Sequence, residues 1–434
     1  MDILRHCLPS SVQRFLEELP ESLDETYKRI LKEIKKPNRD HARRLLQCLV
    51  VAIRPLRVEE LAEVLAINFD DASGIPKLNL SWRWENQEQA LLTSCSSLIT
   101  IVDTGYSRVV QFSHFSVKEF LTSTRLSTSS QDVSLYHVVH KPAHTIMAQA
   151  CLSTLLQLDN LIEGSSVVEL FPLAEYTGGH WLHHAQFEDV ASHIKGMEDL
   201  FDLDKPYFAP WYQFFDIDGF GTRAFSQLID LASPKSNAGT PLYCAALFGF
   251  STLVEHLAVK YPEHVDAIGG CYGTPAVAAL AGRHFQLAQV LYRNGSSVDP
   301  RCRDGFSPLQ SAAIYGDDLE MVRVLLDYGV DVNAQNDRGY TALLYASYTP
   351  FNSDDPEVLG LLLDHHADLN VKTNDGLTPL HLALGTRSIK KARLLVERGA
   401  SVEVQDKDGR TPLDVASEEH RDEIIALLLE HRTK

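Results

Sequence analysis

The sequence has no apolar run long enough to cross a bilayer and no segment that would direct secretion. A membrane-spanning helix needs about 18 apolar residues, and the longest run, around 45–53, reaches about half of that length. The first residues, Met1 to His6, lack the basic stretch and apolar core of a signal peptide. We therefore expect an intracellular protein of the cytoplasm, with the nucleus as the alternative compartment.

Cysteine is sparse and unpaired in the sequence. Seven cysteines occur, at Cys7, Cys48, Cys95, Cys151, Cys244, Cys271 and Cys302. Their number is odd and no C-x-x-C pair occurs, which argues against a disulfide framework and against a structural zinc site. We expect most of them to be small apolar residues of protein cores.

Basic residues are fewer than acidic residues in this sequence. The chain has 40 Lys and Arg residues against 58 Asp and Glu, which gives a formal net charge of −18. Nucleic acids and anionic membranes are held by clustered Lys and Arg, so we expect neither as a partner. The 44% hydrophobic and 23% charged residues are typical of a folded protein, and a length of 434 residues indicates about two to four structural units.

One short phrase recurs six times in the C-terminal half. It reads Gly-Thr-Pro-Leu at 239–242 and Gly-Leu-Thr-Pro-Leu at 376–380, and its Thr or Ser stands at positions 240, 274, 307, 341, 378 and 411. The steps are therefore 34, 33, 34, 37 and 33 residues. Thr and Ser cap helix N-termini well and proline fits the first helical position, so each phrase predicts the start of a helix. Phrase and period resemble the ankyrin family over about residues 236–434, with about six repeats.

The ankyrin resemblance implies a solenoid of helix pairs and hairpin arms that binds proteins. We expect partner contacts at the hairpin tips and on the exposed side of the first helix of each pair. The candidate partner-binding residues are Arg303, Asp304, Tyr315, Asp337, Arg338, Tyr345, Tyr348, Asn374, Asp375, Lys407 and Asp408. An insertion over 348–356, between the helices of the fourth repeat, is expected to bulge outward.

The N-terminal half predicts helices followed by a β-hairpin. Apolar residues recur at helical spacing over 8–36, and further helices are predicted at 41–53, 58–67 and 86–97. Two β-type runs, 98–102 and 108–112, are joined by Asp103-Thr104-Gly105 as a hairpin. A closing helix is expected to start near Ser113. Three helices and a two-stranded wing in this order predict a winged-helix module.

A second resemblance is carried by four phrases in this half. They run from Leu19 to Tyr27, from Arg54 to Ala62, from Cys95 to Leu98 and from Phe112 to Leu121, the last containing Phe112-Ser113-His114-Phe115-Ser116. Over about residues 1–125 the chain resembles the winged-helix part that follows the NACHT nucleotide-binding domain in fungal NLR-like STAND proteins with ankyrin arrays. The resemblance implies that His114 stands at a position that senses the β-phosphate of bound ADP. Because no G-x-x-x-x-G-K-[S/T] loop occurs, we expect no cofactor, and a vestigial, partly buried His114.

The predicted fold class is mainly α, in four parts. A helical segment spans 1–36, a winged-helix-like domain 37–130, an irregular helical linker 131–235 and the ankyrin repeats 236–434. The phrase His180-Trp181-Leu182-His183-His184 resembles the connecting region of the same fungal proteins, and implies a rigid spacer. The chain is interpreted either as a fragment or truncated gene model of a NACHT protein, or as one that lost its NTPase domain.

Three groups of histidines are candidate metal sites, and the sequence argues against each of them. The groups are His137, His140 and His144; His180, His183 and His184; and His365 with His366. Pro142 interrupts the first group, the second lacks the Glu of an H-E-x-x-H site, and the third falls at an expected turn. No G-x-S-x-G nucleophile motif occurs either. We expect no metal ion and no enzymatic activity.

Two functions remain open for a chain of this kind. The first is the sensor or scaffold part of an NLR-like signalling protein, and the second is a free-standing ankyrin adaptor whose N-terminal half is vestigial. A DNA-binding winged-helix regulator is disfavoured, because residues 41–125 hold nine Lys and Arg against nine Asp and Glu, with no basic cluster on the closing helix.

Overall fold

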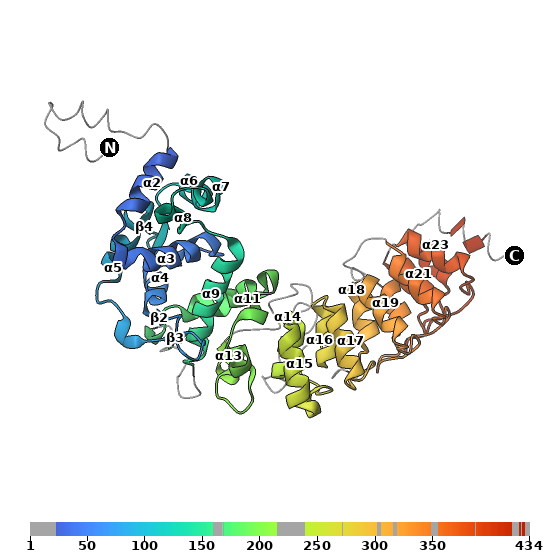
Figure 1. Cartoon of the computed structure of the whole chain (residues 1–434). Coiled ribbons are helices and arrows are strands. Elements are labelled where there is room, and N and C mark those ends of the chain that lie inside the picture. The colour runs from blue at the N-terminus through green and yellow to red at the C-terminus, as the bar shows by residue number, and fades with distance from the viewer. Residues whose placement is uncertain are drawn as a thin grey trace, which may run out of the picture. The chain divides into compact units, whose positions relative to one another are not determined.

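The chain divides into two compact units, Met1–Ile217 and Asp218–Lys434. The computed structural model, drawn in Figure 1, describes residues 23–158, 167, 169–214, 239–270, 272–301, 305–315, 319–348, 355–386, 388–418, 425–426 and 428–429. Within these residues, no helix is both long and apolar enough to cross a membrane.

The first unit begins with a winged-helix arrangement. Its helices are α2 (Leu23–Glu33), α3 (Arg39–Val51), α4 (Val58–Glu63), α5 (Gln87–Cys95) and α6 (Phe115–Thr122). Strands β1 (Leu56–Arg57), β4 (Ile99–Asp103) and β5 (Arg108–Phe112) form an antiparallel sheet in the order β1-β5-β4. Val110 stands opposite Leu56 on one side and Ile101 on the other, so β5 is the central strand.

The predicted helices and the hairpin of this region are confirmed to within a few residues. Sequence reasoning missed β1 and a second small sheet, in which β2 (Ile67–Asn68) pairs with β3 (Lys77–Leu78). Strands of two residues are too short to show the alternation on which strand prediction depends. Helix α2 is the described end of the helical segment predicted over 8–36, and residues 8–22 lie outside the described residues.

Further helices extend the first unit beyond the wing. They are α7 (Thr124–Ser127), α8 (Gln131–Ser134), α9 (His140–Leu155), α11 (Ala174–Gln186), α12 (Met197–Phe201) and α13 (Phe208–Phe214). Helix α9 packs against both α3 and α11. Trp181 and Trp211 are buried edge to face with ring centroids 5.4 Å apart. The described part of the predicted linker therefore shares one core with the winged helix.

A buried carboxylate, that of Glu60, joins these two parts. The Arg54 guanidinium donates two hydrogen bonds to it, at 2.8 and 2.6 Å, and the backbone N–H of Arg57 donates a third at 2.8 Å. Arg54 also lies over the ring of Tyr176, 5.1 Å from its centroid, and Arg57 pairs with Glu175 at 2.9 Å. Because Glu175 and Tyr176 belong to α11, these arginines connect α4 to the linker helices.

Glu63, one helical turn after Glu60, is a second buried glutamate that pairs with an arginine. Its carboxylate is buried and accepts a hydrogen bond from Arg83 at 2.5 Å, and burial raises its pKa. The same guanidinium donates to the carbonyl of Leu170 at 2.6 Å. Buried charges are tolerated only when they are paired and fully hydrogen-bonded, so both glutamates depend on arginines that also reach the region after 167.

We predict that Glu60→Ala lowers the free energy of unfolding of the first unit by about 2–4 kcal/mol, because two partly buried arginines lose their counter-charge. All four tryptophans, Trp82, Trp84, Trp181 and Trp211, lie in this unit, so denaturant unfolding followed by tryptophan fluorescence reports on it alone. Glu59→Ala is the matched control, with an expected change below about 0.5 kcal/mol. Equal stability of the two variants would contradict this account.

The second unit is a stack of helix pairs (Figure 1). Its helices are α14 (Pro241–Phe248), α15 (Ser251–Lys260), α16 (Pro275–Ala281), α17 (Phe285–Arg293), α18 (Pro308–Tyr315), α19 (Leu319–Asp327), α20 (Ala342–Ser347), α21 (Glu357–Asp364), α22 (Pro379–Gly385), α23 (Ile389–Glu397) and α24 (Pro412–Glu418). Neighbouring first helices pack side by side, α14 with α16, α18 with α20 and α20 with α22. The predicted caps are confirmed at Thr240, Thr341 and Thr378, whose hydroxyls accept from N–H groups three residues on.

The hairpins over 336–340, 373–377 and 406–410 are closed by the same pattern of hydrogen bonds. A buried side chain at the start of each, Asn336, Thr373 or Asp406, accepts hydrogen bonds from the backbone N–H groups two and four residues later. The glycine before the last of these residues has φ near +78°, at Gly339, Gly376 and Gly409. That conformation favours glycine, which explains the Asp-Gly pairs that predicted hairpin tips.

Candidate ankyrin recognition surface

Hydrogen bonds run from tip to tip along the array. The backbone N–H of Asn374 donates to the carbonyl of Arg338 at 3.1 Å, and its side-chain amide donates to the carbonyl of Asp337 at 3.0 Å. One repeat later, the N–H of Lys407 donates to the carbonyl of Asp375 at 3.1 Å. These residues were predicted as partner contacts, and the structure brings them together in one row of tips.

A second row of bonds lies at the turn that follows each second helix. The side-chain oxygen of Asn333 accepts from the N–H of Asp368 at 2.7 Å, and that of Asn370 accepts from the N–H of Ser401 at 2.9 Å. Asp266 and Ser297 are bonded in the same way at 2.8 Å. The hairpin arms of the last three repeats are therefore joined to one another on both sides.

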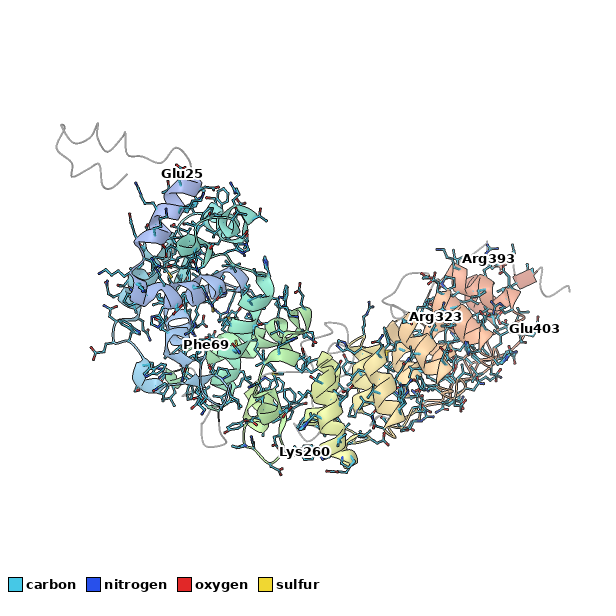
Figure 2. All side chains as sticks on the ribbon, in the orientation of Figure 1. Glu25, Phe69, Lys260, Arg323, Arg393 and Glu403 are labelled. Carbon is cyan, nitrogen blue, oxygen red and sulfur yellow. The ribbon has the colours of Figure 1, made fainter. Side chains whose placement is uncertain are left out.

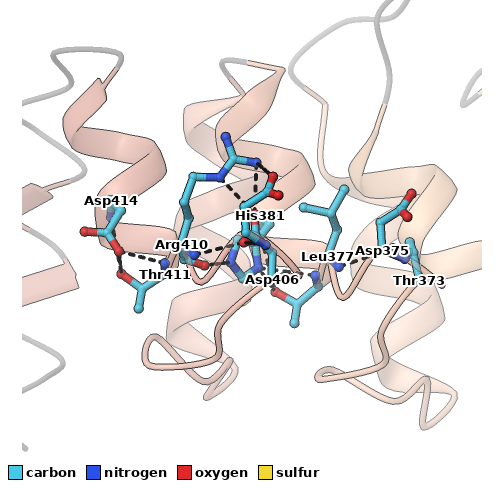
Figure 3. A network of polar contacts seen from close by, with 10 residues as sticks. Thr373, Asp375, Leu377, His381, Asp406, Arg410, Thr411 and Asp414 are labelled. Carbon is cyan, nitrogen blue, oxygen red and sulfur yellow. Dashed lines mark hydrogen bonds and ion pairs between the residues drawn. The ribbon is translucent and has the colours of Figure 1, made fainter.

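The third residue of some first helices adds another bridge between repeats (Figure 3). Nδ1 of His381 lies 2.8 Å from the Thr378 hydroxyl, and its Nε2 lies 3.1 Å from the carbonyl of Arg410 in the next hairpin. Gln310 does the same in the third repeat, since its amide donates to the carbonyls of Ala334 and Tyr340 at 2.7 and 3.0 Å. Burial lowers the pKa of His381, which keeps the ring neutral for this role.

Aromatic rings gather beside the tip of the fourth repeat. Tyr345, on α20, stacks on Phe306 with centroids 5.4 Å apart and on Tyr340 with centroids 4.8 Å apart. Its hydroxyl accepts a hydrogen bond from Asn336 at 2.8 Å. Tyr348, just after α20, is 45% exposed. Of the two predicted anchors here, Tyr345 is held within the ring stack and Tyr348 is the freer side chain.

The charged tip residues face solvent. Asp337, Arg338, Asn374, Asp375, Lys407 and Asp408 are all exposed. Lys407 pairs with Asp375 at 3.6 Å and Asp408 with Arg410 at 3.2 Å, whereas the side chains of Asp337 and Arg338 have no hydrogen bond or ion pair within the described part of the chain. Arg303, Asp304 and the side chain of Tyr315 lie outside the described residues. As partner contacts, all of these remain predictions.

His114 was expected to be partly buried, and this is wrong: its side chain is exposed. It stands at the N-cap of α6, where its Nδ1 accepts from the backbone N–H of Ser116 at 3.3 Å and lies 2.6 Å from the Ser116 hydroxyl. That hydroxyl in turn lies 2.8 Å from the hydroxyl of Tyr27 on α2. The residue therefore caps a helix at the surface.

Two of the predicted histidine groups meet inside the first unit. Nδ1 of His144, on α9, lies 2.8 Å from Nδ1 of His184, on α11. Nε2 of His184 lies 2.8 Å from the Tyr176 hydroxyl, which also accepts from the N–H of Ile53 at 3.1 Å. The objection from Pro142 is wrong for His140 and His144, because α9 begins at His140 and places the proline in its first turn, where no N–H is needed.

These two buried imidazoles bond to each other, so one donates and the other accepts. Burial, aided by the nearby His183, lowers the pKa of His144 to about 4. Burial, aided by His144 and then His183, lowers the pKa of His184 to about 3. Among the described residues, no group of three or more His, Cys, Asp or Glu side chains is arranged to hold a metal ion. The pair acts as a neutral hydrogen-bonded link between α9 and α11.

Comparison with known protein families agrees with both units. A model of ankyrin repeats matches residues 275–372 and 343–434. The C-terminal half is an ankyrin-repeat array. A model of the winged-helix domain of GPI inositol-deacylase matches residues 28–132, and the first unit therefore contains a winged-helix domain. The mainly α fold class predicted from the sequence is confirmed. Ankyrin repeats are an interaction fold, which supports binding of protein partners.

Three curated relatives illustrate the range of similar proteins. Azaphilone pigments biosynthesis cluster protein L of Monascus ruber is 32% identical over 298 residues, covering 65% of this chain and 61% of the relative. Ankyrin repeat and SAM domain-containing protein 6 of Mus musculus is 35% identical over 102 residues, which are 23% of this chain and 11% of the relative. E3 ubiquitin-protein ligase KEG of Arabidopsis thaliana is 31% identical over 114 residues, which are 26% of this chain and 7% of the relative. The chain thus spans less than two thirds of each relative.

We predict that the buried histidine pair makes the first unit less stable in acid. Both folded pKa values lie below 6.5, the ordinary pKa of histidine. The unfolded chain therefore binds more protons as the pH falls from 6.5 towards about 4, and stability is lost over that range. His144→Leu removes one of the two buried imidazoles, so its free energy of unfolding should fall less steeply as the pH is lowered. The measurement is unfolding followed by tryptophan fluorescence at several pH values. The control is His193→Gln, because His193 is exposed and does not shift the pKa of either buried histidine; this variant should keep the full slope. Identical slopes in all three proteins would refute the assignment.

Proposed function

We propose that this chain recognises a protein partner through the hairpin tips of its ankyrin array and the adjoining side chains of the first helices. The observation that carries the proposal is the bonding between neighbouring tips, from Asn374 to Arg338 and from Lys407 to Asp375. A surface that already has its shape loses little conformational entropy when it binds, so more of the contact energy appears as affinity.

The fourth repeat is the favoured centre of this surface. Asp337, Arg338 and Tyr348 are exposed there, and the two charged side chains make no hydrogen bond or ion pair within the described residues. Tyr and Arg are over-represented among the few interface residues that supply most of the binding energy. Within the described residues, a partner can therefore engage these groups without first breaking an ion pair.

For the first unit we propose an anchoring or relaying role in a larger, NLR-like signalling protein of the cytoplasm, with no catalysis of its own. Three things support this role: the winged-helix match over 28–132, the resemblance of the sequence to the region after a NACHT domain, and the arginine–glutamate contacts that join α4 to α11. A free-standing adaptor is the alternative. The relative from Monascus ruber is named for a biosynthesis cluster, and its name states no reaction.

The tip surface is tested by a triple variant, Asp337→Ala, Arg338→Ala and Tyr348→Ala, in the tagged full chain. Partners captured from cells by cross-linking and quantitative mass spectrometry should fall about tenfold or more, since hot-spot truncations each cost about 2 kcal/mol or more. The control is Arg323→Ala, an exposed residue of the second helix α19 (Figure 2). The strongest candidate is then purified and its affinity measured by calorimetry. Unchanged capture by the triple variant would rule out this face.

The role of the first unit is tested by titrating the purified chain with ADP and ATP. We predict no saturable binding, because the sequence contains no phosphate-binding loop and the His114 ring is engaged in capping α6. His114→Ala is the control protein. Saturable binding that is lost in His114→Ala would contradict the prediction and make this chain a nucleotide-dependent switch by itself.

A further inference from the structure

One cluster on the tip side of the array differs chemically from the rest. We name it the aromatic ladder, and it consists of Phe306, Tyr345, Tyr340 and Tyr348. The first three rings are stacked in that order, and their interplanar angles are 28° at both contacts. Phe306 and Tyr340, the outer rings of the stack, are each partly exposed, and Tyr348 is 45% exposed.

The rings of the ladder are fixed before any ligand arrives. Asn336 holds the Tyr345 hydroxyl at 2.8 Å, and the same asparagine accepts from the N–H groups of Arg338 and Tyr340 at 3.0 Å. The backbone of the tip and the central ring therefore share one buried anchor. Rigid aromatic side chains offer contact area at a low cost in conformational entropy.

Negative charge adjoins the ladder. Asp337 is exposed and its carboxylate has no hydrogen-bonded or ionic partner within the described residues. Asp375 lies close enough to Tyr340 to raise its pKa, is exposed, and pairs with Lys407 at 3.6 Å. Arg338 is the positive charge near the ladder, and it opposes the rise in the pKa of Tyr340 and Tyr345. Burial raises the pKa of Tyr340 and of Tyr345, so the phenols stay neutral and their ring faces keep the negative potential that attracts cations.

We propose that the aromatic ladder and Asp337 bind a lysine or arginine side chain from an extended segment of the partner protein. The ring faces and the carboxylate favour a cation at this place, and the net charge of −18 favours the approach of a basic segment from a distance. Arg338, next in the chain, supplies donors for the backbone carbonyls of the same segment. This inference rests on the proposed function and adds the chemistry of the ligand.

The experiment is a selection of phage-displayed peptides on the immobilised full chain, with counter-selection on the Tyr348→Leu variant. The expected consensus contains Lys or Arg at one fixed position. The most enriched peptide is then synthesised with that residue and with norleucine in its place, and both are titrated against the protein. Norleucine keeps the aliphatic chain and removes the charge, so the cationic peptide should bind about tenfold more tightly and should weaken with added salt.

Two variants of Tyr348 distinguish the contribution of its aromatic ring to binding from that of its hydroxyl. Tyr348→Phe keeps the π face and should bind the peptide within about twofold, whereas Tyr348→Leu should bind it about fivefold more weakly. Asp337→Asn should weaken binding and reduce its dependence on salt. Both positions are exposed, so circular dichroism should show unchanged folding in each variant.

The outcomes distinguish this inference from the function on which it rests. An apolar or acidic consensus, or equal binding to Tyr348→Phe and Tyr348→Leu, would overturn the cation site and leave partner recognition by the array standing. Failure to select any peptide that depends on the tip residues would count against both. A basic consensus that depends on the ring and on Asp337 supports both.

Discussion

The hydrogen bonds between neighbouring hairpins are the interaction on which the rest of the array depends. A helix pair of this length cannot bury its apolar face alone, so each repeat needs its neighbours. Small residues on the first helices, such as Ala245 and Ala246, allow close packing, but packing alone leaves the long arms free. Bonds from Asn374 to Arg338 and from Ser401 to Asn370 fix those arms and turn separate loops into one continuous surface.

In the first unit, ion pairs around two buried glutamates connect the winged helix to the helices that follow it. Glu60 and Glu63 lie one turn apart on α4 and are almost completely buried, which is tolerated because Arg54 and Arg83 pair with them. The same arginines contact the helices that follow the wing. The neutral pair His144 and His184 adds a second polar connection between α9 and α11. These contacts join the winged helix to the later helices of the first unit, and two of those helices to each other.

Much of the fold could be predicted because its signals are local. The Thr-Pro-Leu phrase marks each helix start through capping, and the Asp-Gly pairs mark tips through the positive φ at Gly376 and Gly409. The missing parts depend on tertiary contacts. Strand β1 has two residues and exists only because β5 pairs with it. The meeting of His144 with His184, and the stacking that holds Tyr345, join residues whose separations in the sequence carry no periodic signal.

Hydrogen exchange at the tip and turn amides of the hairpin arms in the free chain tests the central claim most directly. The claim is that the recognition surface is formed before any partner binds, through the N–H groups of Asp368, Asn374, Ser401 and Lys407. The account predicts that these amides exchange about a hundredfold or more slowly than those of an unstructured chain. Exchange at unstructured rates in the tips, with the helices still protected, would show that the surface forms only on binding and would contradict the account.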